Sequence, residues 1–224
     1  QLVTRGYEVG IFLANFGRAP SADCAQQLAI CRAMGLATFD LAEDWQESAE
    51  SAFTADLVVD ALFGTGLERP LRAPYDELVE WMNALPAPRL AVDLPSGLDA
   101  GRSHPIGPAI QADATVTFGA PKIAHLLQPA AEWVGELSVA DLGVPFDSSP
   151  CAGGLLEVLT GEDLRHGLPA RASAAHKGEF GHVLLVAGSR GKAGAAILAA
   201  RGAVRGGAGL VTVATVDSAW AALA

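Results

Sequence analysis

The fold of this chain is most constrained by residues 56–100, where two short apolar runs flank a segment with helical spacing. The runs cover Leu57–Phe63 and Arg89–Leu94, and each contains one aspartate. Short apolar runs that end in turn residues are typical of strands buried in a parallel sheet. Between them, residues 73–85 place leucine and methionine on one helical face and acidic side chains elsewhere. The stretch therefore predicts a right-handed strand–helix–strand crossover.

Each predicted strand ends in a carboxylate that is followed by a turn. Asp60 leads into a glycine turn at Gly64–Gly66, and Asp93 leads into a second turn at Pro95–Gly97. Ligands of open parallel sheets bind outside the carboxyl ends of the strands, and a carboxylate buried without a partner would lose its charge. We therefore expect both aspartates to face a ligand, a cation or turn amides. The alternative is that each aspartate simply caps its own turn.

The turn at Gly64–Pro70 combines glycines with a cation, Arg69, and is suited to hold a phosphate through backbone N–H groups and the guanidinium. Tyr75 follows the turn, where its ring either reaches the same ligand or packs beneath the turn. Ser96 lacks the Gly-x-Ser-x-Gly pattern of a nucleophile. We favour a hydroxyl ligand to a cation instead, because Asp60 and Ser96 end neighbouring strands.

The remaining patterns predict a doubly wound α/β domain, a linker and a further strand–helix–strand unit. In the first part we expect strands over Glu8–Ala14, 37–39, Ala112–Phe118 and Gly135–Leu142, a helix over Ala22–Met34 capped by Ser21, an acidic surface helix over Glu43–Ala55 and a helical turn over Ile123–Leu127. The linker candidate is Asp147–Gly154. Beyond it we expect a helix that starts at Thr160 with Asp163 as its capping-box partner, a strand over His182–Ala187, a glycine loop over Gly188–Gly194, a helix over Ala195–Arg205 and a strand over Leu210–Thr215.

Charge and hydropathy narrow the classes of partner. No apolar run approaches the roughly 20 residues that a membrane-spanning helix needs, so we expect no membrane partner. Residues 1–164 hold 8 Lys/Arg and 23 Asp/Glu, a net charge of −15, whereas residues 165–224 hold 7 and 2, a net charge of +5. This change of sign indicates a domain boundary and a second part that meets anions. The acidic first part argues against a nucleic-acid groove.

The three cysteines show neither a disulfide framework nor metal-ligand spacing. We therefore expect a reducing, cytoplasmic setting. Cys24 and Cys31 lie seven residues apart on one predicted helix face, which suggests that both pack in the core.

Two motif sets carry a resemblance to a known family. The segment VVDALFGTGLERP, followed by Tyr75 and AVDLPSGLD, resembles the N-terminal domain of the NAD(P)H-hydrate epimerases, the YjeF N-terminal family. The segment KGEFGHVLLVAGSRGKAGAAILAARGAVRGGAGLVTV resembles the start of the ADP-dependent NAD(P)H-hydrate dehydratases. Bifunctional NAD(P)H-hydrate repair enzymes fuse the two domains in this order. The resemblance covers nearly the whole chain. It implies a Rossmann-like three-layer parallel sheet over residues 1–148 and the beginning of a ribokinase-like α/β domain over residues 155–224.

The resemblance also implies site residues, cofactors and partners. It implies that Asp60 and Ser96 help to hold a potassium ion, and that Ala195 contacts the hydrated substrate in the second domain. It implies contacts with the hydrated dinucleotide for Gly64, Thr65, Gly66, Leu67, Glu68, Arg69, Pro70, Tyr75 and Asp93. ADP or ATP would serve the dehydration step. The expected partner is a small-molecule dinucleotide, without nucleic acid, and we expect a homo-oligomer.

Two departures from the family pattern bear on activity. The family's Asn-Asn-Gly-Gly-Asp-Gly phosphate loop, which supplies one potassium ligand, is absent before the predicted strand at Glu8–Ala14. The second domain stops before the family's nucleotide-binding segments and its late glycine-rich loop with the catalytic aspartate. We therefore expect a piece of a longer protein that does not catalyse dehydration by itself.

Asp93 is the predicted acid/base of the epimerisation. The reaction inverts the carbon that bears the added hydroxyl on the reduced nicotinamide ring. A carboxylate can shuttle the proton as the hydroxyl leaves and returns, or as the ring opens and closes. A hard cation held by Asp60 and Ser96 suits oxygen ligands and would fix the geometry of the substrate.

Three other interpretations stay open. YjeF-like N-terminal domains also occur as inactive modules of messenger-RNA decapping scaffolds, although the intact Asp60, Asp93 and Ser96 argue against a scaffold here. A Rossmann enzyme with hydride chemistry would carry Gly-x-Gly-x-x-Gly after its first strand, where this chain has NFGRAP. The third is that this chain is inactive as it stands.

Overall fold

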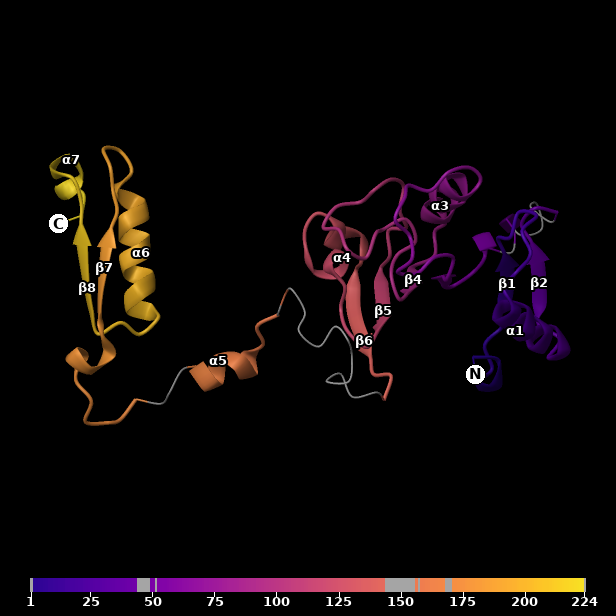
Figure 1. Cartoon of the computed structure of the whole chain (residues 1–224), viewed down its shortest axis with the longest axis horizontal. Coiled ribbons are helices and arrows are strands. Elements are labelled where there is room, and N and C mark those ends of the chain that lie inside the picture. Colours follow the sequence, from indigo (N-terminus) through magenta and orange to yellow (C-terminus); the bar gives the residue numbers. More distant parts are fainter. Residues whose placement is uncertain are drawn as a thin grey trace. The chain divides into compact units, whose positions relative to one another are not determined.

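The structure, a computed structural model, describes residues 2–43, 49–50, 52–143, 156, 158–167 and 171–223. The chain divides into two compact units, Gln1–Gly153 and Gly154–Ala224 (Figure 1). The predicted linker at Asp147–Gly154 lies outside the described residues, as do residues 44–48 and 51 of the predicted surface helix at Glu43–Ala55; residues 49–50 and 52–53 of that segment are helical. Every strand pair in the described parts is parallel, which confirms the predicted α/β class.

The described part of unit 1 contains six strands in two parallel sheets. The two-stranded sheet pairs β1 (Gly10–Leu13) with β2 (Ala37–Asp40), and the four-stranded sheet has the order β3 (Val58–Asp60), β4 (Arg89–Val92), β5 (Ala114–Phe118), β6 (Glu136–Ala140). Its helices are η1 (Val3–Arg5), α1 (Ala22–Ala33), α3 (Tyr75–Ala84), α4 (Ile123–Leu126) and η2 (Ala130–Trp133). The predicted strands and helices are thus confirmed, although β3 and β4 are shorter than their apolar runs.

Local chemistry explains the two longer helices of unit 1. The Ser21 hydroxyl accepts the Cys24 N–H at 3.2 Å and caps α1, as predicted, and Gly35 ends the helix region at φ +75°. The predicted core packing of the cysteines is wrong, since Cys24 is exposed and Cys31 only half-buried. The physical reason is that α1 buries none of its residues. In α3, by contrast, Leu78, Val79 and Met82 form one apolar face that is buried.

Two buried clusters flank the four-stranded sheet. In the first, Leu78, Val79 and Met82 of α3 pack with Ala91 of β4 and with Ile110. In the second, apolar residues that follow β4 pack with Ala124 of α4, Ala130 of η2 and Val134; they are Leu94, Leu98 and Ala109. Strand β4 is therefore covered by packed side chains, as expected for an inner strand of a parallel sheet.

The strand register sets the position of the candidate site. Asp60 pairs with Ala91, and Val92 pairs with Val116, so β3, β4 and β5 end at one edge of the sheet. Parallel strands bring their carboxyl ends to the same edge. The side chains that follow β3, β4 and β5 therefore converge there, although they are far apart in sequence.

In unit 2 the described residues form one parallel strand pair and a covering helix. Its elements are α5 (Gly161–Gly167), η4 (Lys177–Phe180), β7 (His182–Val186), α6 (Ala193–Arg205), β8 (Leu210–Ala214) and α7 (Asp217–Trp220). Helix α6 lies along β7 and β8 (Figure 1). The predicted capping contact is confirmed, because Thr160 donates its N–H to Asp163 Oδ2 at 2.8 Å. Among the residues described, no helix is long and apolar enough to span a bilayer.

Candidate functional site

Asp60 and Ser96 form the buried part of the candidate site, and each is only 1% exposed. The Ser96 hydroxyl donates to Asp60 Oδ1 at 2.7 Å, and the Ser96 N–H donates to Asp60 Oδ2 at 2.8 Å. The Leu62 N–H also donates to Asp60 Oδ1, at 3.2 Å, and the Phe63 N–H donates to Ser96 Oγ at 3.0 Å. The two strand-end turns are thus tied together by hydrogen bonds that run through these two side chains.

The pKa, ion pairs and hydrogen bonds of Asp60 show whether its surroundings suit a cation. Burial raises the pKa of Asp60, and the hydrogen bonds from Ser96 and Leu62 lower it only in part. No lysine or arginine forms an ion pair with it among the described residues. A carboxylate has about four acceptor sites, of which three are used. The oxygen atoms of the Asp60 carboxylate, the Ser96 hydroxyl and the nearby Phe63 carbonyl are ligands of the kind that a hard cation prefers, so the residues fit such an ion.

Asp93 occupies a strained position just after β4. Its φ is +70°, and the Leu94 N–H donates to the Val92 carbonyl at 3.0 Å, which is the pattern of a classic γ-turn. Positive φ at a residue other than glycine is unfavourable and collects at functional sites. The Asp93 N–H is held by the Val116 carbonyl at 2.7 Å. The side chain thereby leaves the line of β4 and projects at the sheet edge.

A lysine that follows β5 meets this aspartate. Lys122 Nζ lies 2.6 Å from Asp93 Oδ1, and the Thr117 hydroxyl donates to the same oxygen at 3.0 Å. Burial is the largest influence on the pKa of Asp93 and raises it, but the hydrogen bonds from Lys122 and Thr117 and the lysine charge outweigh it. The pKa of Asp93 is therefore lowered, and the carboxylate is ionised at neutral pH. The same sheet edge thus holds two aspartates whose pKa values are shifted in opposite directions.

His125 supports the lysine from α4. Its Nδ1 accepts the Lys122 backbone N–H at 2.9 Å, so the proton of the neutral ring is assigned to Nε2. Burial lowers the pKa of His125, and the Lys122 charge lowers it further, which keeps the ring neutral. The buried Nε2 has no hydrogen-bond partner in the part of the chain that the structure describes.

The glycine turn borders the aspartate pair. A Cβ placed on Gly64 would lie 3.5 Å from Asp93 Oδ2, so the start of the turn faces that oxygen. Of the predicted contact residues in the turn, Leu67 is half-buried; the others are exposed, namely Gly64, Thr65, Gly66, Glu68, Arg69 and Pro70. The backbone of this turn is therefore accessible beside a buried, charged edge.

Tyr75 packs among aromatic side chains near the turn. Its ring makes edge-to-face contacts with Phe16 at 5.2 Å and with Phe63 at 5.1 Å between centroids. The Arg18 guanidinium lies 6.0 Å from the centre of the same ring. The packing role is thus observed, and a contact between Tyr75 and a ligand stays a prediction.

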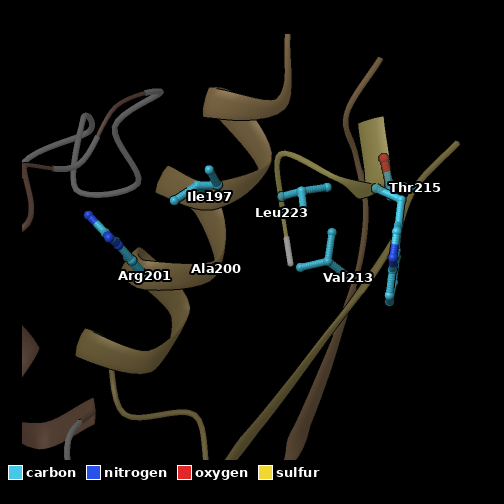
Figure 2. A pocket seen from close by; sticks show the side chains of 7 residues that line it. Ile197, Ala200, Arg201, Val213, Thr215 and Leu223 are labelled. Carbon is cyan, nitrogen blue, oxygen red and sulfur yellow. The ribbon is translucent and has the colours of Figure 1, made fainter. Parts of the chain in front are cut away.

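Unit 2 contains the other predicted contact residue, Ala195, which is exposed in the first turn of α6. A separate pocket of about 230 Å³ lies between α6 and β8 (Figure 2). It is lined by Ile197, Ala200, Arg201, Val213, Thr215, Trp220 and Leu223. Figure 2 shows the Arg201 side chain pointing away from Val213 and Thr215, and Ala195 is not part of the lining. This mainly apolar hollow brings no reactive groups together.

Comparison with known proteins now adds to the geometry. Residues 1–124 match the family described as YjeF-related protein N-terminus. The chain belongs to this YjeF-related family. A crystal structure described as yeast ynu0, YNL200c, has the same fold, with a TM-score of 0.51 and 22% sequence identity over 64% of this chain and 59% of that one.

Relatives of this YjeF-related chain carry an informative name. This chain is 40% identical over 215 residues to the bifunctional NAD(P)H-hydrate repair enzyme Nnr of Moorella thermoacetica, across 95% of this chain and 41% of the relative. It is 37% identical to the enzyme of the same name from Coxiella burnetii, across 94% of this chain and 42% of the relative. The chain therefore spans less than half the length of the curated relatives that it matches.

The structure of this YjeF-related domain brings together Asp60, Ser96, Asp93 and the start of the glycine turn, whose roles stay predictions. Sequence reasoning missed Lys122, Thr117 and His125. One signal was present, because Lys122 ends the Gly-Ala-Pro-Lys turn directly after a strand predicted to lie in the same sheet. The carboxyl end of a parallel strand is the place where such a side chain meets a ligand site.

Proposed function

We propose that unit 1 binds hydrated nicotinamide dinucleotides and interconverts their R and S epimers, with Asp93 as the base. The proposal is carried by one observation: an ionised aspartate is held in a strained turn at the carboxyl end of β4, facing the glycine turn. Strain and a shifted pKa at a sheet edge are marks of a functional group. The name of the relatives, bifunctional NAD(P)H-hydrate repair enzyme, supports the choice of substrate.

The lowered pKa of Asp93 selects between two chemical routes. Hydration of an enamine places the hydroxyl on the carbon bonded to the ring nitrogen. Asp93, as a carboxylate, accepts the hydroxyl proton; a C=O bond forms, and the C–N bond breaks with its electron pair passing to the nitrogen. Rotation about the adjacent C–C bond and the reverse steps then return the proton and close the ring as the other epimer. Departure of the hydroxyl as water would instead require a protonated acid at that position.

Binding groups surround the base in this proposal. The backbone N–H groups of residues 64–69 and the Arg69 guanidinium hold the diphosphate of the dinucleotide. Asp60 and Ser96, with the Phe63 carbonyl, would hold a potassium ion. That ion would supply a fixed positive charge that offsets the buried carboxylate and attracts substrate oxygens.

We further propose that unit 2 begins a ribokinase-like domain that dehydrates the S epimer with ADP or ATP in the complete protein. Support comes from the order β7, glycine loop, α6, β8, and from relatives named bifunctional that align over nearly the whole chain. Ala195, exposed at the start of α6, is the proposed substrate contact. The positive net charge of residues 165–224 suits anionic ligands.

The test of the epimerase proposal uses the protein at its full natural length. The R epimer of hydrated NADH is supplied, and formation of the S epimer is followed by chromatography. Asp93→Asn should lower kcat about 10²- to 10⁴-fold with the fold preserved, because removal of a general base has effects of this size. The matched control is Asp141→Asn, since Asp141 is exposed and its one hydrogen bond within the described residues is from the Gly143 N–H at 2.8 Å. Near wild-type turnover in Asp93→Asn would remove Asp93 from this role, and substrate binding without turnover in the wild type would support a scaffold.

A further inference from the structure

Lys122 reaches from the turn after β5 to the carboxyl end of β4, and all of its donors are used. Its ammonium lies 2.6 Å from Asp93 Oδ1, 2.5 Å from Thr117 Oγ1 and 3.2 Å from the Phe118 carbonyl. A lysine ammonium has three N–H donors. Three acceptors for three donors leave this group one orientation, unlike a mobile surface lysine.

Thr117, in strand β5, is the second residue that holds the Asp93 carboxylate. Its side chain is fully buried, and because Oγ1 accepts from Lys122, its own proton is directed to Asp93 Oδ1 at 3.0 Å. Both donors therefore converge on one carboxylate oxygen. The other oxygen, Oδ2, faces Gly64, where a Cβ would lie 3.5 Å away. The two oxygens of Asp93 are thus in different surroundings.

We propose that Lys122 and Thr117 are positioning residues of the epimerase site, which hold Asp93 Oδ1 and leave Oδ2 as the oxygen that takes the substrate's hydroxyl proton. This inference rests on the proposed function. The inference also gives Gly64 a role in the site, because the absence of a side chain at Gly64 leaves room for the substrate beside Asp93 Oδ2. The γ-turn at Asp93 then has a function, because it directs the carboxylate toward Thr117 of β5 and toward Lys122.

Besides holding Asp93 in place, Lys122 also lowers the pKa of its carboxyl group. Burial acts against the carboxylate, and Lys122 is the cation that opposes it among the described residues. His125, the other titratable side chain packed here, is buried and neutral, and its Nδ1 accepts the Lys122 N–H. His125 therefore fixes the backbone of Lys122 and adds no positive charge. Loss of Lys122 should leave Asp93 more readily protonated.

The experiment combines a titration with kinetics in the full-length protein. Aspartate labelled with ¹³C at the carboxyl carbon gives the pKa of Asp93 by NMR, and Asp93→Asn assigns the signal. Lys122→Met should raise that pKa, move the acid limb of kcat/KM upward by a matching amount, and lower kcat at neutral pH about tenfold or more with little change in KM. Thr117→Val, which keeps the side-chain shape, should lower kcat with a smaller change in the titration.

The matched control is Arg102→Met. It removes an aspartate–cation pair of similar length, Arg102 to Asp99 at 3.0 Å, whose arginine is half exposed. The titration of Asp93 and the epimerase activity should stay as in the wild type. If Lys122→Met does not fold, Thr117→Val alone carries the test.

Two results overturn the inference: an unchanged Asp93 titration in Lys122→Met, or a loss of kcat that is uniform over all pH values with an unmoved acid limb. The second result would identify a merely structural ion pair. Absence of epimerase activity in the wild type refutes the proposed function instead, and the NMR titration then still decides whether Lys122 keeps Asp93 ionised.

Discussion

Replacement of Ser96 by alanine tests whether one buried hydroxyl joins the two strand-end turns. The hydroxyl donates to Asp60 Oδ1 at 2.7 Å and accepts the Phe63 N–H at 3.0 Å, and both Ser96 and Asp60 are 1% exposed. Ser96→Ala removes both hydrogen bonds and adds no new group. The Ser96 N–H keeps its bond to Asp60 Oδ2, so the backbone of the turn should stay in place.

The structure allows the loss of stability to be estimated. A hydrogen bond to a charged acceptor contributes about 1.5–3 kcal/mol, and a buried donor left without a partner costs about 1–3 kcal/mol. Phe63 is only half-buried, so its freed N–H can turn partly to water. We therefore expect Ser96→Ala to lower the free energy of unfolding by about 2–4 kcal/mol.

The assay is urea unfolding followed by circular dichroism, with Ser138→Ala as the matched control. Ser138 is exposed on β6, and its replacement should change the free energy of unfolding by no more than about 0.5 kcal/mol. Ser96→Ala should lower the urea midpoint without a change in slope, because the surface exposed on unfolding stays the same. A loss below about 1 kcal/mol would refute the reasoning, since it would mean that the hydroxyl does not carry both bonds.

Three further predictions concern the same sheet edge. Gly97→Ala should destabilise the chain by about 4 kcal/mol or more or prevent folding, because φ is +104° and a Cβ would lie 2.2 Å from the Pro108 carbonyl, whereas Gly101→Ala should be nearly neutral in the same unfolding assay. Because the folded-state pKa of Asp93 is lowered, the stability it contributes is present above the unfolded pKa and is lost as pH falls through the folded pKa. Urea unfolding across this acid range should show a shallower loss for Asp93→Asn, and identical pH curves would contradict the shift. Potassium should raise the thermal unfolding midpoint more than sodium does, and Asp60→Asn should abolish that difference; an equal response to both ions in the wild type would count against the cation site.

Much of unit 1 was predictable because its signals are local. The alternation of apolar runs, helical spacing and glycine turns depends on residues a few positions apart, so β3, α3 and β4 follow from residues 56–100 alone. The juxtaposition of Asp60 and Ser96 also followed, since consecutive parallel strands joined by a right-handed crossover end side by side. The exposed face of α1 was not predictable from its cysteines, because burial depends on what packs against the helix.

The sequence by itself determined the parallel α/β class, the strand-end positions of both aspartates and the glycine turn beside them. Only the tertiary structure decided that Lys122 meets Asp93, because that contact requires β5 to pair with β4 in one register. It also decided the opposite pKa shifts of the two aspartates. Asp60 is buried among neutral donors, whereas Asp93 is only partly buried and is paired with a cation. Local pattern cannot encode that difference, since the pKa of a carboxyl group depends on burial and on charges that come from distant parts of the chain.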